Sequence, residues 1–254
     1  GFSGTPIIEV DGSMVGSVTG LEITAGASTV KALTINRFRN YGIHLRISGG
    51  NTVEGCFIGT NVTGTVGLSN ASGILVDNVP NNLIGGTAAG ARNLISGNTF
   101  FGVAIFRSGA TGNQVLGNFI GTDINGTADL GNGFFGVGLI DAPDNITGGT
   151  TSDARNIISG NGTSGTQGGI NITGAGSTGN QILGNFIGTD ISGNAPLGNT
   201  NFGVIIQNGA TNNTIGGTAT GALNLISGNN LSGIELRSNT NIVEGNFIGT
   251  DAAG

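Results

Sequence analysis

The sequence predicts an all-β fold, a right-handed parallel β-helix in which about eight coils, each with three short strands, stack into one solenoid. Three observations predict it. The chain of 254 residues holds 52 glycines and only four prolines, with abundant Asn, Thr, Ile and Val, which is typical of short strands joined by tight turns. One motif recurs about every 31 residues. Apolar and other side chains alternate within each copy, and parallel strands are joined by right-handed crossovers.

The composition excludes several other classes of protein. The glycines do not recur at every third position, which excludes collagen, and 37% hydrophobic against 9% charged residues excludes disorder. A net charge of −6 argues against a nucleic acid partner and disfavours acidic polymers. No apolar run approaches the roughly 18 residues of a membrane span, so we expect no membrane insertion. The single cysteine, Cys56, excludes an intramolecular disulfide.

Three series of residues, in phase with one another, define the three strands of each coil. The motif Asn-x-Val/Ile/Thr-x-Gly begins at Asn51, Asn82, Asn113, Asn145, Asn180, Asn213 and Asn241. A glycine followed by Ile or Val stands at Gly42, Gly73, Gly102, Gly136, Gly169, Gly203 and Gly233. An asparagine before a hydrophobic pair stands at Asn93, Asn118, Asn156, Asn185, Asn224 and Asn246. Segments this short cannot bury a hydrophobic face alone, so successive copies must stack.

The segment after each repeated glycine predicts both the core and the exposed face of one sheet. Ile43 and Leu45 and their equivalents in later copies point inward. The residues between them point outward on one long sheet: His44, Leu75, Ala104, Gly138, Asn171, Ile205 and Glu235. We expect a ligand on this face to contact His44, Arg46, Asn171 and Glu235.

The coils alternate in kind, so the repeating unit is a pair of coils of about 63 residues. We assign a single domain, residues 1–254, with residues 1–40 as an atypical opening coil and residues 41–254 as paired-coil repeats. The last copy stops without a cap. We therefore expect a piece of a longer protein whose exposed C-terminal edge pairs end to end with another chain.

The asparagines of the third series have a structural interpretation. In a stack of coils their amides lie above one another, bond along the axis and satisfy turn carbonyls. The predicted ladder consists of Asn93, Asn118, Asn156, Asn185, Asn224 and Asn246.

Repeated Gly-Thr-Asp triplets raise two further interpretations. Asp123, Asn125 and Asp129 offer alternating oxygens around a glycine, as in calcium loops, and Asp190 begins the second copy, where Pro196 replaces the third ligand. Alternatively, each aspartate caps its own turn. The triplets recur every second coil, which is too far apart for the paired carboxylates of a hydrolase. We expect no cofactor other than calcium at these loops.

Basic and aromatic residues suggest carbohydrate sites but also have structural interpretations. Five basic residues cluster near the start of the chain: Lys31, Arg37, Arg39, His44 and Arg46. A polysaccharide lyase would also need carboxylates at the following outward positions, and those positions hold none. Charged residues just beyond the first strands, and Arg155 beside Asp153, suggest surface ion pairs. The aromatic side chains before these strands favour an internal stack under the turn over a sugar platform; they are Tyr41, Phe101, Phe135 and Phe202.

The blocks Asn-Phe-Ile-Gly-Thr-Asp and Asn-Leu-Ile-Ser-Gly-Asn resemble repeats of large bacterial secreted or surface proteins, and the whole pattern resembles the parallel β-helices of the pectin-lyase-like superfamily. The resemblance implies an extracellular or cell-surface setting and carbohydrate-related roles.

Because no repeated coil has a private cluster of ionisable residues, we favour a non-enzymatic structural or binding segment with a polysaccharide or cell-surface partner. The alternative is a carbohydrate-active enzyme, a lyase or hydrolase, with its site around Lys31, Arg39, His44 and Glu54.

Overall fold

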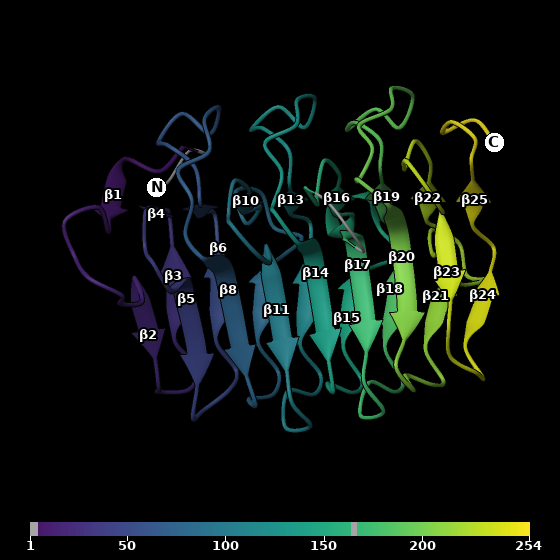
Figure 1. The fold of residues 1–254 in the computed structure, drawn as a ribbon, viewed down its shortest axis with the longest axis horizontal. Coiled ribbons are helices and arrows are strands. Elements are labelled where there is room, and N and C mark those ends of the chain that lie inside the picture. Colours follow the sequence, from purple (N-terminus) through teal and green to yellow (C-terminus); the bar gives the residue numbers. More distant parts are fainter. Residues whose placement is uncertain (1–4, 164–166) are drawn as a thin grey trace.

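The computed structural model describes residues 5–163 and 167–254, and in it the chain forms a right-handed parallel β-helix of about eight coils, as the sequence predicts. Each coil adds one strand to each of three sheets, here named A, B and C, and neighbouring strands within every sheet are parallel. Figure 1 shows the strands side by side along the long axis, with the two termini at opposite ends.

The strand bounds follow the three motif series. Sheet A contains β1 (Ile8–Asp11), β4 (Leu33–Asn36), β7 (Phe57–Ile58), β10 (Leu94–Ile95), β13 (Phe119–Ile120), β16 (Ile157–Ile158), β19 (Phe186–Ile187), β22 (Leu225–Ile226) and β25 (Phe247–Ile248). Sheet B contains β2 (Leu21–Ile23), β5 (Tyr41–Arg46), β8 (Ser72–Asp77), β11 (Val103–Phe106), β14 (Phe135–Ile140), β17 (Gly168–Thr173), β20 (Phe202–Gln207) and β23 (Ile234–Leu236). Sheet C contains β3 (Thr29–Lys31), β6 (Thr52–Glu54), β9 (Leu83–Gly85), β12 (Gln114–Leu116), β15 (Ile146–Gly148), β18 (Gln181–Leu183), β21 (Thr214–Gly216) and β24 (Ile242–Glu244).

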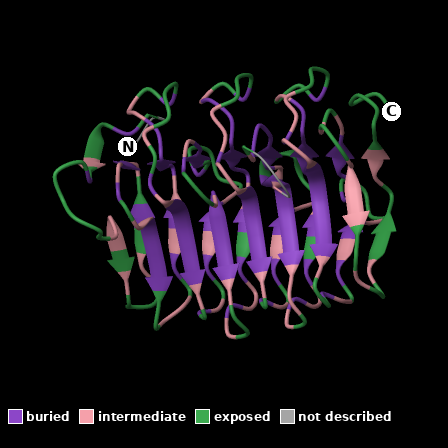
Figure 2. Ribbon diagram, in the orientation of Figure 1, coloured by how far each residue is buried: buried purple, intermediate pink, exposed green. Residues whose placement is uncertain are grey.

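A single continuous core fills the space between the sheets. Ile43 and Leu45 in β5 are fully buried in it, and so are their partners in later coils, such as Val204 and Ile206 in β20, which confirms the predicted inward positions. Burial decreases at both ends of the solenoid, and every residue of β24 is exposed (Figure 2). The stacking of similar coils therefore buries the apolar faces that no single coil can bury.

Three ladders of buried asparagines run along the axis, one at each corner between sheets. In each ladder the side-chain amide and, in nearly every step, the backbone N–H donate to Oδ1 of the asparagine in the next coil, as Asn118 does to Asn156 at 3.1 and 2.8 Å. The six asparagines named from the sequence lie in one of them. The second ladder is Asn51, Asn82, Asn113, Asn145, Asn180, Asn213 and Asn241. The third is Asn70, Asn98, Asn132, Asn161, Asn199 and Asn229.

The turn from sheet C to sheet A requires glycine in every second coil. Gly85 has φ +88°, and a Cβ on it would lie 2.0 Å from the carbonyl oxygen of Leu116 in the next coil. Gly148 and Gly216 repeat this geometry. These glycines let two backbones approach where a side chain would separate the coils.

Helical structure is nearly absent, as the composition predicts. In the described ranges the one helix is a short 3₁₀ turn, η1 (Ser152–Ala154). None of the described residues belongs to a helix with the length and apolarity needed to cross a bilayer.

Candidate functional site

The outward positions of sheet B form one row in register. The row contains Glu22, His44, Leu75, Ala104, Gly138, Asn171, Ile205 and Glu235. Three of the four ligand residues named from the sequence therefore share a row, but four strand spacings, roughly 19 Å, separate His44 from Asn171. Asn171 accepts a hydrogen bond from Gln207, and Glu235 pairs with Arg237 at 2.6 Å. The four residues do not converge on one site.

His44 is the centre of a smaller cluster of polar and charged side chains on β5 and its neighbours. Its Nε2 lies 3.6 Å from Oδ2 of Asp77 in β8, and its ring lies 5.1 Å from that of Tyr41. Arg107 forms a close ion pair with Asp77, and Arg46 lies 3.4 Å from Glu22. The row positions after His44, Leu75 and Ala104, hold no carboxylates, as the sequence indicates, but Asp77 pairs in register with Arg46, so two carboxylates flank the cations.

The His44 imidazole is buried but incompletely hydrogen-bonded. Its side chain is 11% exposed, and Nε2 has no hydrogen-bond partner, since 3.6 Å exceeds hydrogen-bond length. Burial lowers the pKa of His44, and the charges of Asp77 and Glu22 only partly offset this effect. The imidazole is therefore neutral near pH 7 and is able to accept a proton.

An apolar groove of about 340 Å³ adjoins this cluster on the outer face of sheet B. Leu75 and Ala104, which follow His44 in the row, are among the residues that line it, together with Tyr41, Phe101 and Phe106. A groove with apolar and aromatic walls and a polar rim is typical of sites for organic ligands, including sugars.

The aromatic residues before the strands of sheet B pack in a cluster of their own, separate from the main core: Phe135 and Phe202 are buried, as favoured over a sugar platform, while Tyr41 and Phe101 are half-buried. Phe135 and Phe202 belong to a cluster separate from the main core, around Ile205, a residue of the outward row. Phe101 covers Gly138 of the same row, where a Cβ would lie 2.6 Å from its ring. The glycine leaves room for the ring on that face, and this explains why a Phe-rich series precedes these strands.

The other basic residues near the start of the chain do not join His44. Lys31 pairs with Glu54 at 2.6 Å on sheet C, and Arg37 pairs with Asp11 at 2.7 Å beside sheet A. The predicted basic cluster is therefore distributed over three faces. Its proposed combination of Lys31, Glu54 and His44 in one catalytic site is wrong, because the first two lie on a different sheet.

The aspartates of the Gly-Thr-Asp triplets hold their own turns. Asp123 Oδ1 accepts the backbone N–H groups of Thr127 and Ala128, and Asp190 accepts those of Asn194 and Ala195. Burial raises the pKa of Asp123, but these hydrogen bonds outweigh it and lower that pKa overall.

The remaining oxygens of the predicted calcium loop have different surroundings. The amide of Asn125 donates to Asp123 at 3.0 Å, and burial raises the pKa of Asp129. Residues 5–163 and 167–254 contain no group of three or more His, Cys, Asp or Glu side chains placed to hold a metal. Calcium binding by Asp123, Asn125, Asp129 and Asp190 remains a prediction.

Comparison with known proteins identifies the fold but no sequence family. No protein-family model and no curated protein matches the chain. Among solved structures, the periplasmic alginate epimerase AlgG is similar with a TM-score of 0.57 and 17% identity over 91% of this chain and 47% of that one. The A-module of the Azotobacter vinelandii mannuronan C-5 epimerase AlgE6 is similar with a TM-score of 0.55 and 16% identity over 91% and 55%. The chain thus spans about half the length of two parallel β-helix enzymes that act on a polysaccharide.

Proposed function

We propose that this β-helix is a carbohydrate-active protein that binds an acidic, uronate-containing polysaccharide across the outer face of sheet B and acts on it at His44. The observation that favours this function is a buried, neutral histidine without a hydrogen-bond partner on Nε2, beside Arg46 and Asp77 and in register with Leu75, which lines the apolar groove. The fold it shares with two alginate epimerases supports the same substrate class.

The cluster provides the groups required to remove a proton next to a carboxylate. In this reaction the C5–H proton of a uronate passes to the neutral imidazole of His44, and the electron pair of the broken bond moves toward the carboxylate. Arg46, whose charge acts on His44, stabilises the added negative charge. Return of a proton, with the Tyr41 phenol as donor, gives the C5 epimer. Loss of the 4-linked oxygen, which leaves with a proton, gives chain cleavage.

The charge distribution supports binding of an anionic substrate near the N-terminal end of the chain. Residues 1–107 hold six Lys and Arg against five Asp and Glu, whereas residues 108–254 hold two against nine. The net charge of −6 therefore resides in the later coils. An acidic polymer therefore meets the least electrostatic repulsion at the coils that contain His44. The net negative charge of the whole chain does not exclude binding of an acidic polymer there.

The same proposal includes a location outside the cytoplasm, since a polysaccharide of this kind is met in the periplasm or beyond it, and AlgG is periplasmic. A purely structural segment is the second candidate. The three asparagine ladders favour it, because they stiffen every coil equally and need no ligand.

The test is incubation of the protein with polymannuronate, polyguluronate and polygalacturonate, with NMR to detect new C5 epimers and ultraviolet absorbance to detect unsaturated ends. We expect one product with wild-type protein and none with His44→Gln, which keeps a polar side chain but no base. Glu244→Gln on sheet C is the control and keeps activity. Absence of any product from all three polymers rejects the enzymatic proposal and leaves the structural segment.

A further inference from the structure

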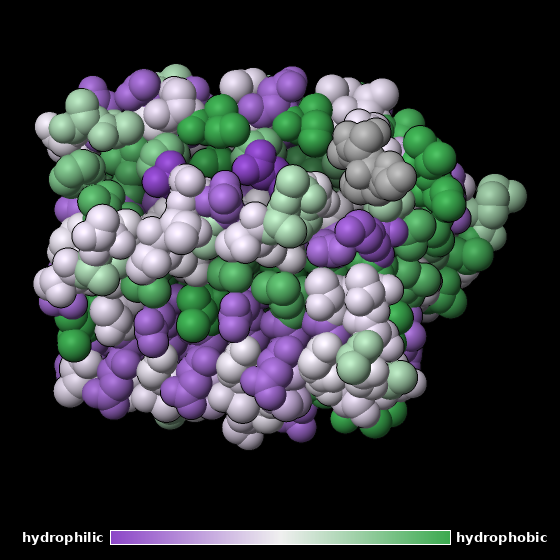
Figure 3. Space-filling view, turned by 180° about the vertical axis from the view of Figure 1, so that it is seen from behind, coloured by the Kyte–Doolittle hydropathy of each residue, from purple (hydrophilic) through white to green (hydrophobic). Residues whose placement is uncertain are grey.

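A second surface, on the outer face of sheet A, repeats with the two-coil period. Its floor is a row of buried apolar side chains: Phe57, Leu94, Phe119, Ile157, Phe186 and Leu225. The loops that leave every second coil fold over this row and bond to one another, because Ile124 N–H donates to Gly64 at 3.0 Å and Ile191 N–H donates to Gly126 at 2.9 Å. Figure 3, from the reverse side, shows hydrophobic side chains gathered in the upper part of this face.

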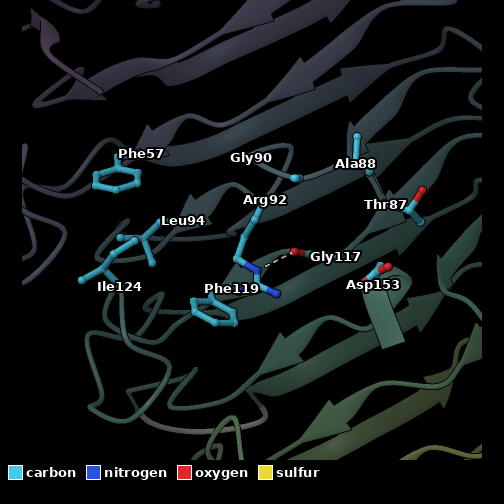
Figure 4. A pocket seen from close by; sticks show the side chains of 12 residues that line it. Phe57, Thr87, Ala88, Gly90, Arg92, Leu94, Gly117, Phe119, Ile124 and Asp153 are labelled. Carbon is cyan, nitrogen blue, oxygen red and sulfur yellow. Dashed lines mark hydrogen bonds between the residues drawn. The ribbon is translucent and has the colours of Figure 1, made fainter. Parts of the chain in front are cut away.

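Two pockets open between these loops and the next corner, each with an arginine over a phenylalanine. In the first, of about 450 Å³, Arg92 lies 4.2 Å above the ring of Phe119 and its Nε donates to Gly117 at 3.1 Å (Figure 4). In the second, of about 430 Å³, Arg155 lies 4.1 Å above Phe186 and donates to Gly184 at 3.2 Å. Both pockets therefore hold a guanidinium in one orientation.

The two arginines differ in their compensating charge. Asp153, on the loop of the second repeat, lines the first pocket and acts electrostatically on Arg92. Gly221 occupies the equivalent position in the second pocket. Within the described residues no carboxylate forms an ion pair with Arg155, so the Arg155–Asp153 pair suggested by the sequence does not form. Burial lowers the pKa of the Arg155 guanidinium. A half-buried cation without a counter-ion is costly, and a bound anion offsets that cost.

The spacing and the chemistry of the pockets define the ligand. Phe119 and Phe186 lie two strand spacings apart, roughly 9.6 Å, which is close to the length of two pyranose rings in an extended 1,4-linked chain. Each pocket combines a guanidinium for a carboxylate with an apolar wall, Ile124 or Ile191, for the C–H face of a sugar. We infer that the Arg92 and Arg155 pockets are two subsites that bind carboxylates of alternate residues in one extended uronate chain.

This surface lies on a different sheet from His44, so it binds a length of polymer that the catalytic face does not contact. The inference rests on the proposed function for the identity of the polymer, but the two fail separately. Loss of the Arg92 and Arg155 subsites weakens polymer binding and leaves turnover of short oligomers intact, whereas loss of His44 abolishes turnover and leaves these subsites occupied.

The test is calorimetric binding of size-defined oligouronates to the full chain with Arg155→Gln, Arg92→Gln and the double variant. We expect a hexamer to bind more tightly than a dimer, about tenfold weaker binding with Arg155→Gln, since a charge-assisted hydrogen bond is lost, and a smaller effect with Arg92→Gln. Arg237→Gln is the matched control, since Arg237 also lies over a phenylalanine, Phe202, but pairs with Glu235.

Arg155→Lys separates charge from folding, because it keeps the cation without the planar fork and should bind with intermediate affinity. Unchanged hexamer binding in the double variant overturns the inference, and so does equal binding of neutral or sulfated oligomers. If no variant turns over any polymer but Arg155→Gln still loses affinity, the proposed reaction fails and these subsites stand.

Discussion

Replacement of a single ladder asparagine should destabilise the solenoid more than any surface change of the same kind. Asn156 is fully buried at the centre of its ladder. Its Oδ1 accepts from the backbone and side-chain N–H groups of Asn118, at 2.8 and 3.1 Å, and its Nδ2 donates to Val115 at 2.8 Å and Asn185 at 2.9 Å. Asn156→Ala removes all four bonds and leaves the buried backbone N–H of Asn118 without an acceptor.

The magnitude follows from the count of bonds. Each of the four hydrogen bonds contributes about 1 kcal/mol net, and the buried donor left without a partner costs at least as much again, so we expect a loss of about 5 kcal/mol in the free energy of unfolding. Asn194→Ala is the matched control. Asn194 is exposed and its side chain makes no hydrogen bond with any described residue, so its loss should change stability by less than about 0.5 kcal/mol.

Urea unfolding followed by far-ultraviolet circular dichroism measures both variants, since the chain has no tryptophan for fluorescence. The midpoint for Asn156→Ala should fall well below that of wild type, while Asn194→Ala unfolds like wild type. Equal midpoints for the two variants would refute the claim that the ladders stabilise the fold.

Three further results follow from the same structure. Gly85→Ala should unfold the chain or abolish its soluble expression, because the new Cβ meets a backbone oxygen at 2.0 Å. Gly90 also has a positive φ but open space around it, so Gly90→Ala should lower the free energy of unfolding by only about 1 kcal/mol. Similar losses of stability in the two variants would contradict this reasoning. Burial raises the pKa of Cys56 from 9.0 to about 11. The contribution of the protonated thiol to stability is therefore complete below pH 9.0 and is lost as pH rises through about 11. The melting temperature of Cys56→Ala, measured over the same pH range, should not show this fall. Asp123→Ala should lower the melting temperature equally in calcium and in chelator, since the carboxylate caps its own turn, and a loss confined to calcium would show a metal site instead.

Periodicity made the fold and the core predictable, because each inward position is repeated in seven or more coils and the repeat leaves one way to bury them. The ladder at Asn93 was predictable for the same reason. The ladder at Asn98 was not, although Ser-Gly-Asn triplets contain three of its members, Asn98, Asn161 and Asn229, because its members follow loops of different length and lose strict spacing.

The contact between His44 and Asp77 could not be predicted without the register of the strands. Asp77 lies 33 residues from His44 in the sequence, and only the pairing of β5 with β8 places the two side by side. Arg155 and Asp153 are neighbours in the sequence, yet they line different pockets, since Asp153 turns toward the repeat that contains Arg92. Proximity in the sequence thus suggested the Arg155–Asp153 pair, which does not form, and gave no indication of the contact between His44 and Asp77, which does.

The imidazole signals of His44 test the account's central claim most directly, because His44 is the one histidine in the chain and needs no assignment. Proton and carbon NMR spectra are recorded during titration with an oligouronate and with a neutral oligosaccharide of equal length. The account predicts that the oligouronate shifts these signals and changes the pKa of His44, while the neutral oligosaccharide does not. Signals that stay unchanged at saturating oligouronate would contradict an acidic polysaccharide site on the outer face of sheet B.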